Sequence, residues 1–292
     1  MTYRFTTSPH LLEFEAPVAL HRHPTRLSEK RDKDTLHAEL AGHVEHIADK
    51  QSVLYAHDVH ALLLVFQGMD ASGKDGTIRK VLSGVNPAGC SVTSFKAPNS
   101  EEMDHDYLWR VSRFLPPRGT IGAFNRSHYE DVLVVRVHPE LLGRQKLRSR
   151  KMLDDVWPRR YRAIRDWERH LADNGTVILK FFLHLSREEQ RTRLLERIED
   201  PEKRWKFDPR DLTERALWDD YRQAYEAALT ETNRPWAPWY VIPADEKAYA
   251  RAAVAQIVRE TLDRLDLSWP QPDVASTTAL EVARKVLVSE TT

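Results

Sequence analysis

Cysteine is nearly absent from this sequence, because Cys90 is the single cysteine among 292 residues. One thiol cannot form a disulfide within the chain, which is typical of proteins kept in a reducing compartment. We interpret Cys90 as a small buried side chain rather than as a reactive nucleophile. An excess of charge is also missing, since 44 lysines and arginines balance 44 aspartates and glutamates. The balance removes any global electrostatic argument for binding nucleic acid.

Long apolar stretches are missing as well. No run approaches the roughly 18 residues that a membrane-spanning helix needs, and the first residues lack the apolar core of a signal peptide. Apolar residues still make up 41% of the chain and charged residues 30%, which is typical of a globular protein. We therefore expect a cytoplasmic protein that does not act at a membrane.

The order of strand and helix patterns predicts an α/β fold. A continuous apolar run at 61–68 and a second strong signal at 176–185 are typical of strands buried on both faces of a parallel sheet. Weaker strand patterns occupy 90–95, 119–125 and 239–245. Helical patterns lie between them, at 29–56, 74–83, 101–114, 155–175, 186–199, 211–230 and 246–265. This alternation predicts a doubly wound parallel sheet with helices on both faces.

The sequence shows no linker and no internal repeat, so we predict a single domain spanning 1–292. The first 28 residues, 1–28, contain prolines that interrupt helices, and we interpret them as a strap over the surface. The tail, 267–292, is weakly patterned and is a candidate for docking a partner subunit.

The stretch "GMDASGKDGT" at 68–77 matches the phosphate-binding pattern G-x-x-x-x-G-K. It follows the most apolar strand and precedes a helix, so the backbone N–H groups at the helix N-terminus would face an anion. An ordinary glycine-rich turn is the alternative. The candidate phosphate-binding residues of this loop are Gly68, Ala71, Ser72, Gly73, Lys74, Asp75, Gly76 and Thr77.

Two acidic residues set this loop apart. Asp75 stands where the usual pattern has serine or threonine, and it also suits the positive end of its own helix. Asp70 has no such explanation, because a carboxylate inside the loop would repel phosphate unless a cation lies between them. Asp70 therefore implies Mg²⁺ bridging phosphate oxygens.

With "FNRSHYEDVLVVRVH" at 124–138, the loop strongly resembles the family-2 polyphosphate kinases. The segments "HDYLWRVSRFLPPRGTIGAFNRSHY", "SREEQRTRLLERIEDPEKRWKFDP" and "RPWAPWYVIPADEKAYAR" extend the resemblance over roughly residues 30–265. It implies a P-loop kinase-like fold with a helical lid at 186–215 and transfer of a phosphoryl group between inorganic polyphosphate and AMP or ADP. It further implies ATP and guanine nucleotides as possible nucleotides, Mg²⁺ or Mn²⁺ as cofactor, and a homo-oligomer.

The second motif begins at the end of the predicted strand 119–125. One branch of the family has aspartate before the arginine, whereas this chain has Asn125 and Arg126. Asn125 can offer an oxygen to a metal or a nucleotide but no charge, and Arg126 is expected to contact phosphate. Glu130 either lies at the acceptor site or completes a capping box with Ser127. We interpret His128 as a packed histidine rather than a catalytic base.

Basic residues farther along the chain complete the candidate site. Arg193 matches the lid arginine of the family, and the following loop carries Lys203 and Arg204, which are expected to follow a polyanion. Arg113 and Arg118 flank a proline turn near the expected phosphate channel, although ordinary surface charge explains them equally well.

Two tryptophans in "RPWAPW", Trp236 and Trp239, are candidates for contact with a nucleotide base. Core packing is the reading that we favour for both of them.

The expected activity is polyphosphate-dependent phosphorylation of AMP and ADP, with Asp70, Lys74, Arg126 and Arg193 as the catalytic groups. The alternative enzyme is an ATP-dependent nucleoside monophosphate kinase on the same fold. A regulatory guanine-nucleotide switch is disfavoured because the chain lacks an N-K-x-D segment. The Asn125-Arg126 form resembles the branches that accept monophosphates, so we expect AMP to be used and ADP to follow.

Overall fold

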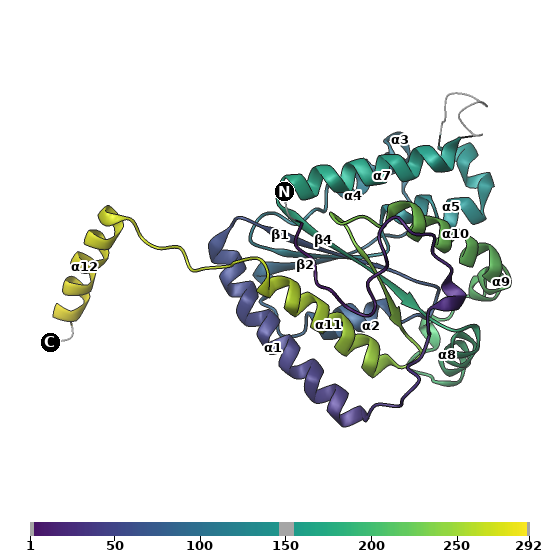
Figure 1. The fold of residues 1–292 in the computed structure, drawn as a ribbon, viewed down its shortest axis with the longest axis horizontal. Coiled ribbons are helices and arrows are strands. Elements are labelled where there is room, and N and C mark those ends of the chain that lie inside the picture. The colour runs from purple at the N-terminus through teal and green to yellow at the C-terminus, as the bar shows by residue number, and fades with distance from the viewer. Residues whose placement is uncertain (1–2, 146–154, 291–292) are drawn as a thin grey trace.

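The computed structural model describes residues 3–145 and 155–290, and a five-stranded sheet forms its centre (Figure 1). Residues 1–2 of the expected strap and 291–292 of the expected tail lie outside the described ranges. All neighbouring strands run parallel, in the order β2-β3-β1-β4-β5. The strands are β1 (Ala61–Gln67), β2 (Cys90–Ser94), β3 (Ile121–Asn125), β4 (Thr176–His184) and β5 (Trp239–Pro243). The predicted doubly wound parallel sheet is confirmed.

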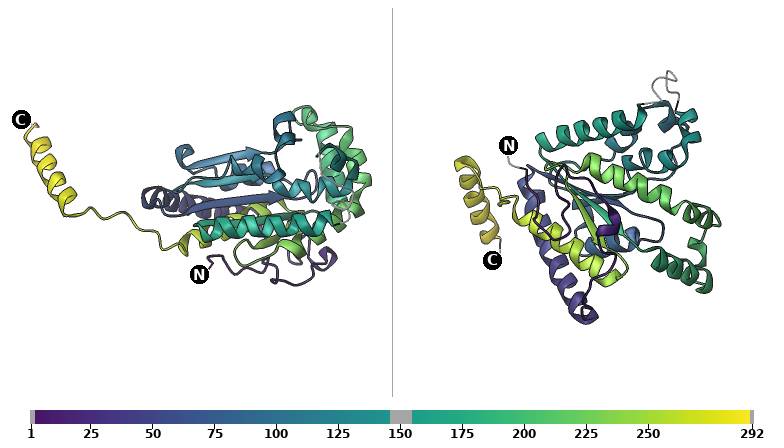
Figure 2. Two further views of the ribbon diagram at one scale, coloured as in Figure 1. Left: turned by 90° about the horizontal axis from the view of Figure 1, so that it is seen from above. Right: turned by 45° about the vertical axis from the view of Figure 1, so that its right-hand side comes forward.

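Helices cover both faces of the sheet (Figures 1 and 2). The helices are α1 (Lys33–His57), α2 (Lys74–Val81), α3 (Ser100–Asp104), α4 (Tyr107–Ser112), α5 (Val134–Val137), α7 (Val156–Asp173), α8 (Arg187–Glu199), α9 (Arg210–Ala216), α10 (Trp218–Thr232), α11 (Lys247–Asp263) and α12 (Val274–Ser289). The apolar side chains of α1, α2 and α11 form one core cluster, whereas those of α4, α7 and α10 belong to another.

Strand β1 is apolar from Ala61 to Phe66, and its packing shows why. Successive side chains point to opposite faces of a sheet, and both faces of β1 are covered. Leu62, Leu64 and Phe66 pack into the cluster with α1 and α11. Leu63 and Val65 pack into the cluster with α7 and α10. Every residue of β1 is buried, so a polar residue before Gln67 would be costly on either face.

The N-terminal segment runs along the outer edge of β5. The N–H of Leu12 donates to the carbonyl of Trp239 at 3.0 Å, and the N–H of Val241 donates to the carbonyl of His10 at 2.8 Å. Leu11 and Tyr240 form an antiparallel bridge between these bonds. The segment therefore covers an edge whose backbone groups would otherwise be open to another chain.

Two predicted helices are interrupted. The expected helix 101–114 is divided into α3 and α4, because the carboxylate of Asp106 accepts from the N–H groups of Leu108 and Trp109 and starts a new helix. The expected helix 211–230 is divided at Leu217 into α9 and α10. Local capping at Asp106 overrides a helical pattern that runs on through the sequence.

The C-terminal tail contains a helix that the weak pattern did not predict. Asp273 caps α12 by accepting from the N–H of Ser276. Figures 1 and 2 show α12 standing clear of the sheet and its helices at the end of an extended segment. Within the ranges 3–145 and 155–290, no helix has the length and apolar character to cross a bilayer.

The strand order places two loops side by side. Parallel pairing aligns Phe66 of β1 with Asn125 of β3, so both strands end at the same edge of the sheet. The strand order departs in both directions from β1, and such switch points are where open α/β sheets bind ligands. The loop at 68–73 and the motif at 125–131 therefore meet at this edge.

Candidate active site

The loop between β1 and α2 has the backbone of a phosphate cradle. Gly73 caps α2 with φ at 98°, and Ala71 also lies in the left-handed region with φ at 62°. A Cβ on Gly68 would stand 2.8 Å from the carbonyl oxygen of Leu183, so a side chain there would collide with backbone. Glycine at these positions lets the loop turn tightly and leaves its amide groups for an anion.

Lys74 is buried beneath this loop and is only 7% exposed. Its ammonium group donates to the carbonyl of Gly68 at 2.7 Å and to that of Met69 at 3.2 Å. Burial and, to a smaller extent, the nearby charge of Arg126 lower the pKa of Lys74 to about 8, while Asp70 opposes the shift. The lysine is therefore a cation close to losing its proton, which a phosphate would stabilise.

Arg126 joins the two loops. Its guanidinium donates to Asp70 at 2.8 Å through Nη2 and to Glu130 at 2.9 Å through Nη1. Glu130, followed by Asp70, raises the pKa of Arg126, so the group stays charged. Arg126 also has φ at 62°, a left-handed conformation that strains a non-glycine residue. Strain of about 1–3 kcal/mol is typical of positions that aim a functional group.

Asp75 and Asn125 form a second link between the loops. The Asn125 amide donates to Oδ1 of Asp75 at 2.6 Å and to Oγ of Ser94 at 3.3 Å. Asp75 therefore does more than favour the positive end of α2. Because the amide nitrogen is engaged, the carbonyl oxygen of Asn125 is the atom left for a nucleotide or a metal.

The structure separates the two explanations of Glu130. Its carboxylate pairs with Arg126 instead of reaching back to the N–H of Ser127, so the capping box is not formed. Ser127 does cap the short helix η3 (His128–Asp131) by accepting from the N–H of Tyr129. His128 is buried, packs against Trp167 and has its pKa lowered by burial. The packed interpretation of His128 is confirmed.

A buried ionic cluster lies behind η3. Lys180 on β4 donates to Glu168 on α7 at 2.7 Å, to the hydroxyl of Tyr129 at 2.8 Å and to the carbonyl of Thr232 at 2.9 Å. Burial lowers the pKa of Lys180 to about 8, and Glu168 opposes that shift. The cluster ties η3 to both neighbouring helices and so fixes where Arg126 and Glu130 project.

Arg193 differs from the expectation of a lid arginine that closes over the phosphoryl group. It is 4% exposed and donates to the carbonyls of Ala71 and Ser72 through Nη1 and to those of Ala244 and Asp245 through Nη2. Glu189, one turn earlier on α8, accepts from Nε. The arginine therefore supports the backbone of the phosphate loop. Its position in α8 directs the guanidinium to the loop carbonyls and away from the solvent.

Arg118 lies at the wrong edge of the sheet for a phosphate contact, so that prediction is corrected. Its guanidinium donates to the carbonyl of Asn174, next to Gly175 at the start of β4. Arg118 precedes β3 whereas Asn125 ends it, and a parallel strand carries the chain from one edge to the other. Trp239, at the start of β5, is likewise buried at the amino edge, where its indole donates to Thr232.

The other predicted basic residues lie at the surface. Arg113 is placed over the ring of Trp109 and stands 3.8 Å from Glu101. Lys203 pairs with Asp200 at 2.7 Å, and Arg204 in η5 (Arg204–Lys206) donates to the carbonyl of Ile198. Their contacts with a polyanion stay predictions. Trp236, the second candidate for a base contact, packs beneath Arg169 and beside Tyr3.

The loop residues not yet placed surround the start of α2. Ser72 and Thr77 are each 3% exposed, and the hydroxyl of Ser72 lies 3.4 Å from the ammonium of Lys74. A Cβ on Gly76 would stand 3.1 Å from the guanidinium of Arg251, so the first turn of α2 lies close to an arginine of α11. Both observations fit an anion-binding helix start.

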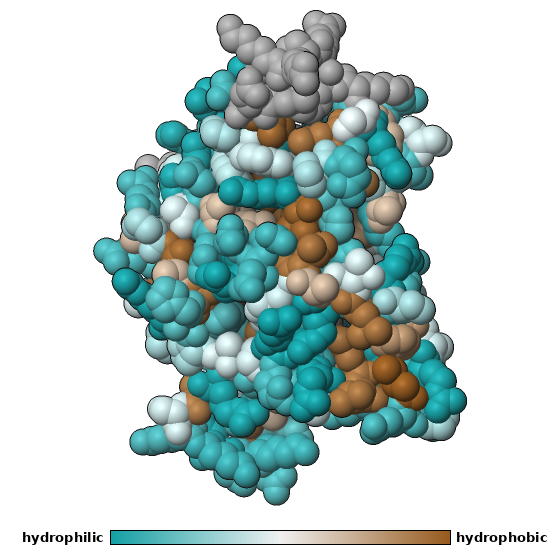
Figure 3. All heavy atoms as spheres, turned by 90° about the vertical axis from the view of Figure 1, so that its right-hand side faces the viewer, coloured by the Kyte–Doolittle hydropathy of each residue, from teal (hydrophilic) through white to brown (hydrophobic). Residues whose placement is uncertain are grey.

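Sequence reasoning predicted a lid at 186–215 but missed four residues of α8, α9 and α10, the helices that gather at the right of Figure 1. Viewed from that side, Figure 3 shows hydrophilic side chains interrupted by hydrophobic patches. Gln190 donates to the carbonyl of Asp70 at 3.0 Å, and Arg215 donates to Gln190. With Trp218 and Tyr221, these residues line a cavity of about 30 Å³ against Asp70 and Arg126. No local pattern marks them, because they converge only through the packing of α9 and α10.

The donor set at this edge suits a magnesium ion shared with substrate. In residues 3–145 and 155–290, histidine, cysteine and carboxylate groups form no cluster of three that could hold an ion alone. Asp70 lies within the phosphate loop and pairs with Arg126. Asp75 follows the loop and accepts from Asn125, whose carbonyl oxygen is a further possible ligand. Mg²⁺ typically uses one or two carboxylates together with substrate phosphates, so these residues fit it.

Comparison with known proteins agrees with this geometry. The family described as polyphosphate kinase 2 (PPK2) matches residues 30–268. An ADP-polyphosphate phosphotransferase of Rhodopseudomonas palustris is 50% identical over 273 residues, which are 93% of this chain and 94% of that protein. An AMP/ADP-polyphosphate phosphotransferase of Meiothermus ruber is 54% identical over 226 residues, which are 77% of this chain and 80% of that protein.

A solved structure is similar over nearly the whole chain. The crystal structure of polyphosphate kinase 2 from Arthrobacter aurescens superimposes with a TM-score of 0.84 and 38% identity, covering 97% of this chain and 99% of that one.

Proposed function

This chain belongs to the polyphosphate kinase 2 family, and from that membership we propose that it transfers a phosphoryl group from inorganic polyphosphate to AMP and ADP. The observation that carries the proposal is the meeting of two loops at one sheet edge. Lys74 and Asp70 come from the loop after β1, and Arg126 and Glu130 come from the motif after β3. Cations and carboxylates converge there around a backbone anion site.

The reaction needs positioning and charge neutralisation more than covalent help from the protein. An oxygen of the acceptor phosphate bonds to the terminal phosphorus of polyphosphate. The bond from that phosphorus to the bridging oxygen breaks, and a polyphosphate one unit shorter leaves. The loop amides, Lys74 and Arg126 hold the transferred group. An acceptor phosphate is ionised near neutral pH, so the site needs no strong general base.

Magnesium supplies charge neutralisation between phosphate oxygens and carboxylates when it is bound. Asp70 is the residue we propose for holding it, with Asn125 offering an oxygen, and Mn²⁺ is the expected substitute. Because Asp70 pairs with Arg126 at 2.8 Å, a bound metal would share this carboxylate with the arginine. Closure of the region 186–215 over bound substrate belongs to the same proposal.

The proposed acceptors follow from the residue at position 125. Asn125 brings no charge, so it places one carboxylate fewer beside the acceptor than an aspartate would. The name of the Rhodopseudomonas palustris relative mentions ADP alone, whereas that of the Meiothermus ruber relative mentions both AMP and ADP. We propose that AMP is converted to ADP and that ADP is carried on to ATP. Guanine nucleotides are proposed as further acceptors.

A time course from AMP alone, with excess polyphosphate and Mg²⁺, tests this. ADP followed by ATP is the expected result. No consumption of AMP, while a parallel reaction started from ADP proceeds, would contradict the argument from Asn125. Lys74→Ala should abolish both steps, whereas Lys80→Ala, an exposed lysine of the same helix, should leave them intact. Equal rates with ATP in place of polyphosphate as donor would favour the alternative, an ATP-dependent monophosphate kinase.

We also propose that the protein works as a homo-oligomer in which α12 docks on a second copy of the chain. A lone helix of 16 residues is marginally stable in water, so α12 needs a covering surface. Val282 and Val286 are 57% and 52% exposed on the monomer. Positions 279, 282, 283 and 286 follow helical spacing and form an apolar face.

A further inference from the structure

The N-terminal strap, which the structure describes from residue 3 to residue 28, does more than cover the outer edge of β5. Figure 1 shows it crossing in front of the sheet toward α8 before it reaches α1. There, Oγ1 of Thr25 donates to Oδ2 of Asp245 at 2.9 Å, and the N–H of Asp245 donates to the carbonyl of Thr25 at 3.0 Å. Asp245 follows β5, so the strap is tied to the sheet edge that also holds the phosphate loop.

The carboxylate of Asp245 also holds the turn that leads into α8. Its Oδ1 accepts from the N–H of Ser186 at 2.8 Å, and Ser186 caps α8 by accepting from the N–H of Glu189. Each carboxylate oxygen therefore accepts from a different segment, one from the turn between β4 and α8 and the other from the strap. A carboxylate with two such partners fixes the spacing between the segments that supply them.

Arg193 carries this connection to the phosphate loop. Its Nη2 donates to the carbonyl of Ala244 at 2.6 Å and to that of Asp245 at 3.1 Å. Its Nη1 donates to the carbonyl of Ala71 at 3.0 Å and to that of Ser72 at 3.2 Å. The guanidinium is planar and rigid, so its two sets of bonds hold the loop after β5 at a set distance from the phosphate loop. A shift of Asp245 therefore shifts the support of the phosphate loop.

We propose that Asp245 is a positioning residue for phosphoryl transfer and that the strap acts through it on the phosphate loop. The path runs from Thr25 to Asp245 and then through Arg193 to the loop carbonyls. The inference rests on the proposed kinase activity and adds to it a segment outside the substrate site. Because misplacing a reacting group by about 1 Å costs about 10²-fold in rate, a small shift of the loop is enough to lower kcat.

Two threonines of the strap provide a variant and its matched control. Thr25 donates to Asp245, whereas the hydroxyl oxygen of Thr6 lies 3.2 Å from that of Thr261. Figure 1 shows α11 running away from α8, and Thr261 belongs to the last turn of α11. Thr25→Val and Thr6→Val each remove one side-chain hydrogen bond of the strap, and only the first bond lies on the path to Arg193.

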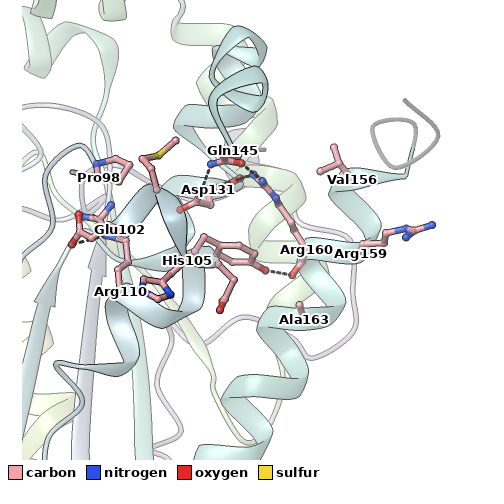
Figure 4. A pocket seen from close by; sticks show the side chains of 13 residues that line it. Pro98, Glu102, His105, Arg110, Asp131, Gln145, Val156, Arg159, Arg160 and Ala163 are labelled. Atoms are coloured by element: carbon pink, nitrogen blue, oxygen red, sulfur yellow. Dashed lines mark hydrogen bonds and ion pairs between the residues drawn. The ribbon is translucent and has the colours of Figure 1, made fainter. Parts of the chain in front are cut away.

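Neither substitution alters the large cavity on the same edge of the sheet. This cavity of about 270 Å³ lies between α4 and α7 (Figure 4). Among the residues that the structure describes, those that line it belong to 98–110 and 156–163, together with Asp131 and Gln145. The strap, α8 and the loop after β5 take no part in this lining. A slower Thr25→Val variant would therefore report on the phosphate loop.

Steady-state rates with AMP, polyphosphate and Mg²⁺ are the first measurement. We expect Thr25→Val to lower kcat about tenfold, with KM for both substrates changed by less than about twofold, and Thr25→Ser to restore kcat because it keeps the hydroxyl. Thr6→Val should leave kcat unchanged, although the loss of a bond at this fully buried residue lowers the melting temperature. A normal kcat in Thr25→Val, a change in KM alone, or an equal fall in Thr6→Val would overturn the proposal.

Hydrogen exchange is a second measurement, and it needs no turnover. The amides of 68–77 should exchange faster in Thr25→Val than in Thr6→Val or the unchanged protein, because weaker support lets the loop open more often. Equal exchange in all three proteins would overturn the proposal. Thr25→Ala takes the place of Thr25→Val if the latter does not fold. If the unchanged protein shows no polyphosphate-dependent turnover, the proposed activity fails, and the exchange rates alone decide the role of Asp245.

Discussion

Lys74 shows how a single residue's surroundings set its behaviour. Burial lowers its pKa to about 8, so the free enzyme loses this positive charge as the pH rises past that value. We expect kcat/KM to decline above about pH 8, since a neutral lysine binds phosphate poorly. Bound polyphosphate favours the charged form, so the decline in kcat should appear at higher pH. Rate profiles from pH 6 to 10 check this, and a flat kcat/KM across that range would contradict it.

Asp70 and Asp75 have distinct partners and should respond differently to substitution. Asp70 pairs with Arg126 and lies outside any helix, so a helix dipole does not explain its charge. Asp75 lies at the start of α2 and accepts from Asn125. We expect Asp70→Asn to lower the rate at least as much as Asp75→Asn, and high Mg²⁺ to restore part of the loss in Asp70→Asn. Titrations of rate against Mg²⁺ for both variants provide the measurement. An unchanged metal requirement in Asp70→Asn would show that it is not a ligand.

At the scale of elements, α8 holds the phosphate loop in place through Arg193. Its guanidinium bonds to the carbonyls of Ala71 and Ser72, so its removal should loosen the loop. We expect Arg193→Ala to lower kcat by about 10²-fold, with a smaller change in nucleotide affinity, as for a group that positions others. Arg191→Ala, at an exposed position of the same helix, is the control. A normal kcat in Arg193→Ala would remove the positioning role.

Strand β4 and helix α7 are joined by an ion pair whose two partners depend on each other. Lys180 and Glu168 are both fully buried, and Nζ of Lys180 lies 2.7 Å from Oε2 of Glu168. Lys180→Met should cost about 3–5 kcal/mol in the free energy of unfolding, because it leaves the carboxylate of Glu168 uncompensated.

The double variant Lys180→Met with Glu168→Met is the comparison. It should recover most of that stability, since the isolated charge is then gone. Urea denaturation of the single and double variants measures both values, and additive losses in the double variant would contradict a coupled pair.

At the scale of the whole molecule, α12 is the part with the least contact to the rest. Its exposed apolar face leads us to expect that Val282→Glu with Val286→Glu lowers the oligomeric state. Thr278→Glu, on the polar side of the helix, should leave assembly unchanged. Light scattering during size-exclusion chromatography measures the mass of each variant. Equal masses for the unchanged protein and both variants would show that α12 does not hold subunits together.

Much of the fold was predictable because its signals are local. The runs at 61–68 and 176–185 are mostly apolar, since β1 and β4 are buried on both faces of a parallel sheet. The phosphate loop was also predictable, because its shape depends on its own glycines and on the helix that follows. The divided helices at Asp106 and Leu217 and the helix α12 were not, since each depends on capping or on a surface away from the local pattern.

Contacts between distant residues required the folded chain. The strand order brings Asp70 to Arg126 and Asp75 to Asn125, pairs that are 56 and 50 residues apart. It also carries Arg118 to the opposite edge, although its place in the sequence suggested the phosphate channel. Periodicity and spacing record which residues share a helix or a strand. They do not record which strands become neighbours, and that arrangement alone decides which charges meet.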